Sequence, residues 1–212
     1  MKKQITLRNL IVCCLASAIM FFCGCNFPEQ RPPREIKTYM LEAVLPQIPS
    51  AVKMPYCFSV RPCRAAPAFT TKFLVYRTGE SEYEKDFYSQ LLTTPAEDIT
   101  QTLSEWIAAA GWKTCVPGTA PKDYYTVVSA LDEFYGDFRD STNPNAVVKM
   151  QISLTFTDSS CKCMRTIFTK PYEARILMPN ATVKDLITAW AKGLEKIFAN
   201  FQKDVEISLR EF

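Results

Sequence analysis

The chain has 212 residues, with 25 Lys and Arg against 22 Asp and Glu, and it contains no histidine. The absence of histidine excludes serine–histidine and cysteine–histidine catalysts as they are usually built, and most catalytic zinc sites. The six glycines form no phosphate-binding loop motif. We therefore expect a protein that is not an enzyme and that holds no metal or cofactor.

The chain begins with a basic segment and an apolar run, which is typical of a secretory signal peptide. The apolar run, residues 10–22, has 13 residues, fewer than the roughly 20 that a membrane-crossing helix needs. The segment that ends at Cys25 resembles the lipobox of bacterial lipoproteins, in which a small residue, here Gly24, precedes the cysteine that receives the lipid. We expect a signal peptide over residues 1–24 and a lipid on Cys25, and the alternative is an uncleaved membrane anchor.

Cleavage before Cys25 changes the charge of the mature protein. It removes Lys2, Lys3 and Arg8, so Lys and Arg fall from 25 to 22 and equal the 22 Asp and Glu. A formally neutral domain lacks the basic footprint of a nucleic-acid-binding protein, which excludes that class. Asn26 is not the aspartate that, by family resemblance, retains lipoproteins at the inner membrane. We therefore expect attachment to the periplasmic face of the outer membrane, with the inner membrane as the alternative.

The lipidated cysteine is followed by a short tether and then by one domain. Residues 25–36 are polar and rich in proline, which is the composition of a semi-rigid extended spacer. Residues 37–212 are enough for a single domain with its own core. Apolar side chains alternate with polar ones over residues 148–157, which predicts a half-exposed strand of an antiparallel sheet. Turn-forming residues precede this strand, and we expect a hairpin with a strand over residues 124–134. The other expected strands are residues 37–41, 57–60, 73–77, 112–116 and 163–168.

Two helices are predicted from their capping residues and apolar stripes. The first begins with a capping Thr94, with Pro95 at the first helical position and Glu97 at the third. The second begins at Thr182, with Asp185 as its capping partner. The expected fold class is α+β, with a mostly antiparallel sheet and two amphipathic helices packed on one of its faces. The expected core positions are Ile99, Leu103, Trp106, Ile107 and Ala110 in the first helix, and Val183, Leu186, Ile187, Trp190, Leu194, Ile197, Phe198, Phe201 and Val205 in the second.

Five cysteines besides Cys25 remain in the domain, and an oxidising periplasm favours disulfides among them. Cys57 and Cys63 are close enough in sequence to close a small loop, whereas the spacing of Cys161 and Cys163 is awkward for a mutual bridge. The odd number leaves at least one free thiol. We interpret these cysteines as structural rather than redox active, and the sequence leaves their pairing open.

The stretch at residues 69–77, Phe-Thr-Thr-Lys-Phe-Leu-Val-Tyr-Arg, resembles the core strand of the ABC-type transport auxiliary lipoproteins. Proteins of this family accompany envelope lipid transporters of the mammalian-cell-entry class, including those of the paraquat-inducible type. Further segments match in order over nearly the whole mature chain, among them residues 95–97, 111–116 and 123–135. The chain departs from the family at residues 89–92, where no tryptophan precedes the first helix.

The resemblance implies a non-catalytic periplasmic accessory protein, tethered by Cys25, that docks a transporter whose ATPase and permease lie in the inner membrane. It implies a substrate-binding subunit of the mammalian-cell-entry type as the partner, and a homo-oligomeric ring is known among relatives. The density of aromatic residues near the first helix favours Tyr83, Phe87 and Tyr88 as partner contacts. The same three side chains are equally compatible with packing in the core.

Three other functions compete with this hypothesis. The first is a lipid-binding carrier that holds an acyl chain between the sheet and the helices. The second is a structural lipoprotein of another envelope-assembly machine. The third is a hydrolase that uses a pair of carboxylates, although surface charge explains these acids better. The pairs are Asp132 with Glu133, Asp137 with Asp140, and Glu82 with Glu84.

Overall fold

Three long strands with alternating side chains form the centre of the fold in the computed structural model. They are β6 (Tyr124–Asp137), β7 (Asn145–Asp158) and β8 (Cys163–Leu177), and they pair antiparallel in chain order. On β7, every second side chain from Val148 to Leu154 is fully buried, as the period of two predicts. The predicted hairpin is therefore confirmed.

The structure describes residues 35–42, 45–46, 50–116, 122–161 and 163–210. The predicted signal peptide, Cys25 and the tether up to residue 34 lie outside these residues. From residue 36 onward the chain forms one compact unit. A search of the described residues finds no helix with the length and hydropathy to cross a membrane.

Shorter strands complete an eight-stranded sheet with the order β1-β5-β4-β6-β7-β8. β2 (Cys57–Val60), β3 (Arg64–Ala65) and β4 (Phe73–Arg77) follow one another along one edge of β6, each parallel to it. β5 (Tyr83–Leu91) pairs antiparallel with β4, and β1 (Lys37–Tyr39) pairs parallel with the end of β5. The long pairings are antiparallel and the parallel ones are short, so the sheet is mixed and the fold class is α+β.

The first helix, α2 (Pro95–Ala109), begins and ends with the backbone chemistry that the sequence predicts. The N–H of Thr94 donates to Oε2 of Glu97 at 2.9 Å, and the Thr94 hydroxyl accepts the N–H of Glu97 at 3.4 Å, which completes the capping box. Beyond the last turn, Gly111 has φ of 82°, a left-handed conformation that glycine adopts at low steric cost.

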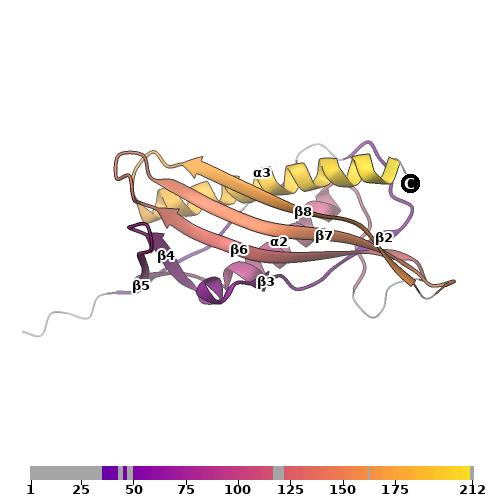
Figure 1. Cartoon of the computed structure of the whole chain (residues 1–212), viewed down its shortest axis with the longest axis horizontal. Helices are drawn as coiled ribbons and strands as arrows, with labels where there is room; N and C mark the ends of the chain where they lie inside the picture. The colour runs from indigo at the N-terminus through magenta and orange to yellow at the C-terminus, as the bar shows by residue number, and fades with distance from the viewer. Residues whose placement is uncertain (1–34, 43–44, 47–49, 117–121, 162, 211–212) are drawn as a thin grey trace, which may run out of the picture. The chain divides into compact units, whose positions relative to one another are not determined.

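The second helix, α3 (Val183–Arg210), lies across β7 and β8 on the same face of the sheet as α2 (Figure 1). Trp190 is fully buried, and its ring stacks on Phe134 of β6 with centroids 4.1 Å apart. Gly193 lets the helix approach the sheet closely, because a Cβ there would lie 3.3 Å from Val148. All apolar positions predicted for the two helices are buried, apart from the half-buried Val183.

The structure corrects the predicted strands, most clearly in three places. Residues 112–116 form no strand and meet β2 at a single bridge between Phe58 and Thr114, because the chain reaches Pro117 directly afterwards and proline has no N–H for a ladder. β5 was not predicted, since its charged sequence lacks a period of two. β8 continues nine residues beyond the expected end at Phe168 and contains Pro171, which an edge strand tolerates.

The structure gives the pairing of the cysteines, which the sequence leaves open. Cys57 of β2 bonds to Cys115 and does not close a loop with Cys63, which is the buried free thiol that the odd number of cysteines requires. Cys161 and Cys163 bond to each other at the β7–β8 turn, a pairing that the sequence spacing disfavoured. Burial raises the pKa of the Cys63 thiol, so this side chain stays protonated and acts as a small apolar core residue.

Candidate outer-face site

A β-bulge in β6 decides which of its side chains leave the helix-covered core. The register between β6 and β7 shifts between Leu131 and Glu133, so Asp132 is an extra residue in β6. Because side chains alternate across a strand, one extra residue exchanges the faces of everything that follows. Phe134 therefore packs beneath α3, while Tyr135 lies on the opposite face of the sheet, which we call the outer face.

Tyr135 is the centre of an aromatic cluster on the outer face. Its ring meets Tyr83 edge-on with centroids 5.6 Å apart, and it lies nearly parallel to Phe69 at 6.4 Å. Phe87 meets Phe73 edge-on at 5.2 Å, farther along β4 and β5. We call these five residues the outer aromatic cluster. Its side chains range from buried to exposed: Tyr135 is 1% exposed, Tyr83 50% and Phe87 62%.

A cavity of about 310 Å³ opens on the outer face between the short helix η1 (Pro67–Phe69) and strands β4, β5 and β6. This volume lies at the lower end of the range for small-molecule sites. Aromatic and apolar side chains dominate its lining, and Glu133 is paired with Lys149 at 3.6 Å. The principal lining residues are Phe69, Val75, Tyr83 and Tyr135, with Lys85 and Glu133 as the charged ones.

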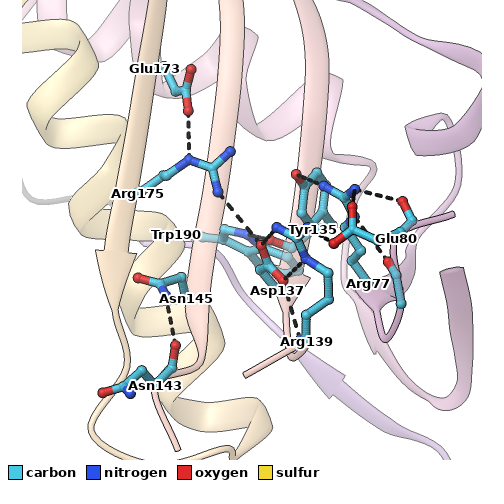
Figure 2. A network of polar contacts seen from close by, with 11 residues as sticks. Arg77, Glu80, Tyr135, Asp137, Arg139, Asn143, Asn145, Glu173, Arg175 and Trp190 are labelled. Carbon is cyan, nitrogen blue, oxygen red and sulfur yellow. Dashed lines mark hydrogen bonds and ion pairs between the residues drawn. The ribbon is translucent and has the colours of Figure 1, made fainter. Parts of the chain in front are cut away.

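The buried carboxylate of Asp137 binds arginine side chains at the end of the sheet, next to the outer aromatic cluster (Figure 2). Arg139 binds Asp137 in a bidentate manner, with N–O distances of 2.9 and 2.8 Å. Nη1 of Arg175 lies 3.6 Å from the same carboxylate. Hydrogen bonds from the Arg139 side chain, aided by the charges of nearby arginines, hold the pKa of Asp137 below its ordinary value.

Arg77 connects this network to the cluster. Its guanidinium donates to the backbone oxygen of Glu80 at 2.7 Å, and Nη1 lies 3.5 Å from the Tyr135 hydroxyl (Figure 2). The same guanidinium is 5.7 Å from the centroid of the Tyr83 ring, which is within reach of a cation–π interaction. Tyr83 is therefore held in place from two sides although half of it is exposed.

Phe87 and Tyr88 project where β5 bulges. The β4–β5 register places three extra residues of β5, 87–89, between two consecutive positions of β4. The Asp86 carboxylate stabilises the bulge by accepting the N–H groups of Tyr88 at 2.8 Å and Ser89 at 3.0 Å. Burial opposes the ionisation of Asp86, but these bonds and one from a tyrosine hydroxyl together lower its pKa.

The three side chains predicted as partner contacts are exposed rather than packed in the core. Tyr83, Phe87 and Tyr88 all lie on β5, and Tyr88 is 46% exposed. Contact with a partner stays a prediction, as does the lipid on Cys25. Sequence reasoning missed Phe69 and Tyr135, because only the bulge in β6 turns Tyr135 toward Phe69, and one extra residue leaves no recognisable signal in the pattern.

Asp137 and Asp140, one of the carboxylate pairs considered for hydrolysis, have structural partners. Asp137 is held by two arginines, and Asp140 accepts the hydroxyl of Thr142 at 2.6 Å and the N–H of the same residue at 2.9 Å in a turn. In the described part of the chain, Asp158, Cys161 and Cys163 are the group placed closely enough to hold a metal ion. Both sulfurs are in the disulfide, so they offer no thiolate while that bond persists.

No family model matches the chain, and no curated protein matches it. Among solved structures, the chain is similar to a protein from Xanthomonas campestris of family DUF330, with 12% identity and a TM-score of 0.69 over 82% of this chain and 98% of the other. A second solved structure, of an uncharacterised protein, is similar with 14% identity and a TM-score of 0.62 over 81% of this chain and 99% of the other. At these identities the likeness shows the fold alone.

Proposed function

We propose that this chain is a non-catalytic periplasmic lipoprotein of an ABC-type lipid transport system of the mammalian-cell-entry class. Anchored through Cys25 at the periplasmic face of the outer membrane, it would dock the transporter through its outer face. The partner would be the substrate-binding subunit of the transporter, with its permease and ATPase in the inner membrane. The resemblance at residues 69–77 supports the family, and the outer aromatic cluster supports the docking surface.

The observation that carries the proposal is the combination of exposure and fixed position at Tyr83 and Phe87. Tyr83 packs against Tyr135 and Arg77, and Phe87 packs against Phe73, yet at least half of each of the two side chains is open to solvent. Aromatic residues and arginine dominate the energetics of protein interfaces. Side chains that are already ordered lose little conformational entropy when a partner binds. More of the free energy gained by burying them therefore contributes to the affinity.

The alternative of a lipid carrier with an acyl chain between sheet and helices has less support. Among the described residues, that space is filled by stacked and edge-on rings. Trp190 stacks on Phe134, and Trp106 meets Phe198 edge-on at 5.8 Å. Trp106 also donates to Gln202 at 3.0 Å, which joins α2 to α3. An acyl chain there would have to displace these contacts.

An affinity pull-down of the full-length lipoprotein from crosslinked, detergent-solubilised membranes tests the proposal. We expect mass spectrometry to identify a substrate-binding subunit of the mammalian-cell-entry type with its permease and ATPase. A triple variant with alanine at Tyr83, Phe87 and Tyr88 should lose these subunits. The matched control replaces Met164 and Ile207, which are 69% and 58% exposed on β8 and α3, and should retain them. Unchanged recovery with the triple variant, or no transporter subunit with the wild type, would contradict the proposal.

A further inference from the structure

On the side away from β4, β5 is paired along only part of its length. β1 covers residues 89–91. Within the described ranges, no strand pairs with residues 83–86 on that side. The bulge of β5 begins directly after residue 86, so the open stretch and the stretch that β1 covers do not form one regular edge.

Among the described residues, the open edge has backbone groups at defined positions that face no neighbouring strand. In the β4–β5 hairpin the N–H of Thr78 donates to the carbonyl of Glu82 at 3.1 Å. Hydrogen-bonded pairs alternate along an antiparallel ladder, so Glu84 also bonds toward β4. Tyr83 and Lys85 then direct their N–H and C=O groups away from β4, to the side on which an additional strand would lie.

The two residues with outward backbone groups are also residues that line the outer-face cavity. The side chains of Tyr83 and Lys85 both border it, together with Val75 of β4. In a sheet, side chains directly opposite each other on neighbouring strands have Cβ atoms about 5 Å apart. An added strand beside β5 would therefore bring a side chain on the outer face within reach of the cavity.

The open edge of β5 differs in sequence from the opposite edge of the sheet. Glu82 and Glu84 are exposed, and among the described residues neither has an ion pair within 4 Å. The opposite edge, β8, has Pro171 in the middle of the strand, and a proline on an edge strand is one of the features by which proteins protect an edge from pairing. Residues 83–88 contain no proline and expose three aromatic side chains.

We infer that the open edge of β5 binds an extended segment of a partner protein as an added strand. An apolar or aromatic side chain of that segment occupies the outer-face cavity, and lysine or arginine at alternate positions faces Glu82 and Glu84. Main-chain hydrogen bonds to Tyr83 and Lys85 supply affinity, and the cavity supplies specificity. The inference rests on the proposed function, since it specifies the chemistry by which a transporter subunit would be held.

A defined peptide tests the inference on the full-length protein in neutral detergent micelles. The probe is the fluorescein-labelled heptapeptide Lys-Val-Lys-Phe-Lys-Val-Lys, with binding followed by fluorescence anisotropy. Lys85→Pro removes an outward N–H without removing a bond to β4, and Lys85→Ala removes the side chain but keeps the N–H. We expect Lys85→Pro to bind at least tenfold more weakly than Lys85→Ala. A peptide methylated on alternate backbone nitrogens should lose binding to a similar extent, and its glutamate analogue should not bind.

Several results would overturn the inference. They are absence of binding by the probe, equal affinities of the two Lys85 variants, and binding of the methylated peptide at full strength. If the protein self-associates and Lys85→Pro abolishes this self-association, the edge binds a second copy of the chain instead. If the probe binds only after residues 26–34 are deleted, the edge binds the tether instead. Recovery of transporter subunits at wild-type level by a Lys85→Pro variant that does not bind the probe would refute the inference and leave the proposed function standing. Thermal unfolding of Lys85→Pro and Lys85→Ala is measured as the control for folding, and both should unfold cooperatively.

Discussion

Phe134 and Tyr135 are neighbours in β6, yet they belong to regions with different physical character. Phe134 lies beneath α3 and stacks on Trp190, within a layer of fully buried side chains. Tyr135 lies on the outer face, where its aromatic neighbours become progressively exposed and a cavity remains open. On the inner face, the side of the sheet that α2 and α3 cover, stacked and edge-on rings fill the space beneath the helices, whereas the outer face is ordered and leaves a cavity open. We therefore expect folding to depend mainly on the first region, and we propose that binding depends on the second.

The largest expected effect comes from inserting one alanine between Glu133 and Phe134, which shifts the part of β6 after the bulge by one residue. The insertion would turn Tyr135 toward α3 and move Phe134 outward, since side chains alternate along a strand with a period of two. We expect loss of the cooperative urea transition followed by circular dichroism. Asp132→Ala is the control, because it keeps the residue count and alters an exposed side chain, and its stability should match the wild type within about 0.5 kcal/mol. An insertion variant as stable as the wild type would contradict this assignment of the two faces.

Trp190→Ala should produce the next largest effect, because it empties the centre of the inner face. Truncation of a buried tryptophan costs about 3–5 kcal/mol in the free energy of unfolding. Tyr83→Ala on the outer face should cost about 1 kcal/mol, the scale of one aromatic pair. Urea denaturation of the two variants measures the difference, and equal losses would contradict the contrast between the faces.

The two disulfides should contribute unequally to stability. Cys57 and Cys115 are separated by 58 residues, so their bond restricts a long loop in the unfolded chain, and its removal should cost about 2–4 kcal/mol. The bond between Cys161 and Cys163 spans two residues at an exposed turn and restricts almost nothing. Thermal unfolding of the two double-alanine variants separates these effects, and an equal shift of the melting temperature in both would refute the explanation.

A smaller, pH-dependent effect is expected at Asp137, which fixes the end of the outer face. Its side-chain bonds from Arg139 hold its pKa in the folded protein below the ordinary value of about 3.9. A depressed pKa stabilises the folded state fully above that ordinary value, and the contribution is lost as the pH falls through the lower folded value. Asp137→Asn should thus be less stable than the wild type at neutral pH, and the gap should close below about pH 4. A melting-temperature gap that stays constant from pH 7 to 2 would show that ionisation is not responsible.

The sequence predicts the inner face well and the outer face poorly. The capping box at Thr94 and the apolar stripes of both helices are local patterns, and the structure confirms them. The faces of β6 after Leu131 depend on one extra residue, which the pattern of side chains does not reveal. The exposure of Tyr83 and Phe87 depends in turn on the pairing of β5, a strand that has no clear period. Aromatic density marked these residues as candidates, but packing in the core explained that density equally well.

The central claim is that the exposed aromatic side chains of β5 serve binding and contribute little to folding. The most direct test measures both properties on the variant with alanine at Tyr83, Phe87 and Tyr88. We predict a free energy of unfolding within about 2 kcal/mol of the wild type, since all three side chains are at least 46% exposed, together with loss of the transporter subunits from crosslinked membranes. A folded triple variant that still recovers these subunits at wild-type level would contradict the claim.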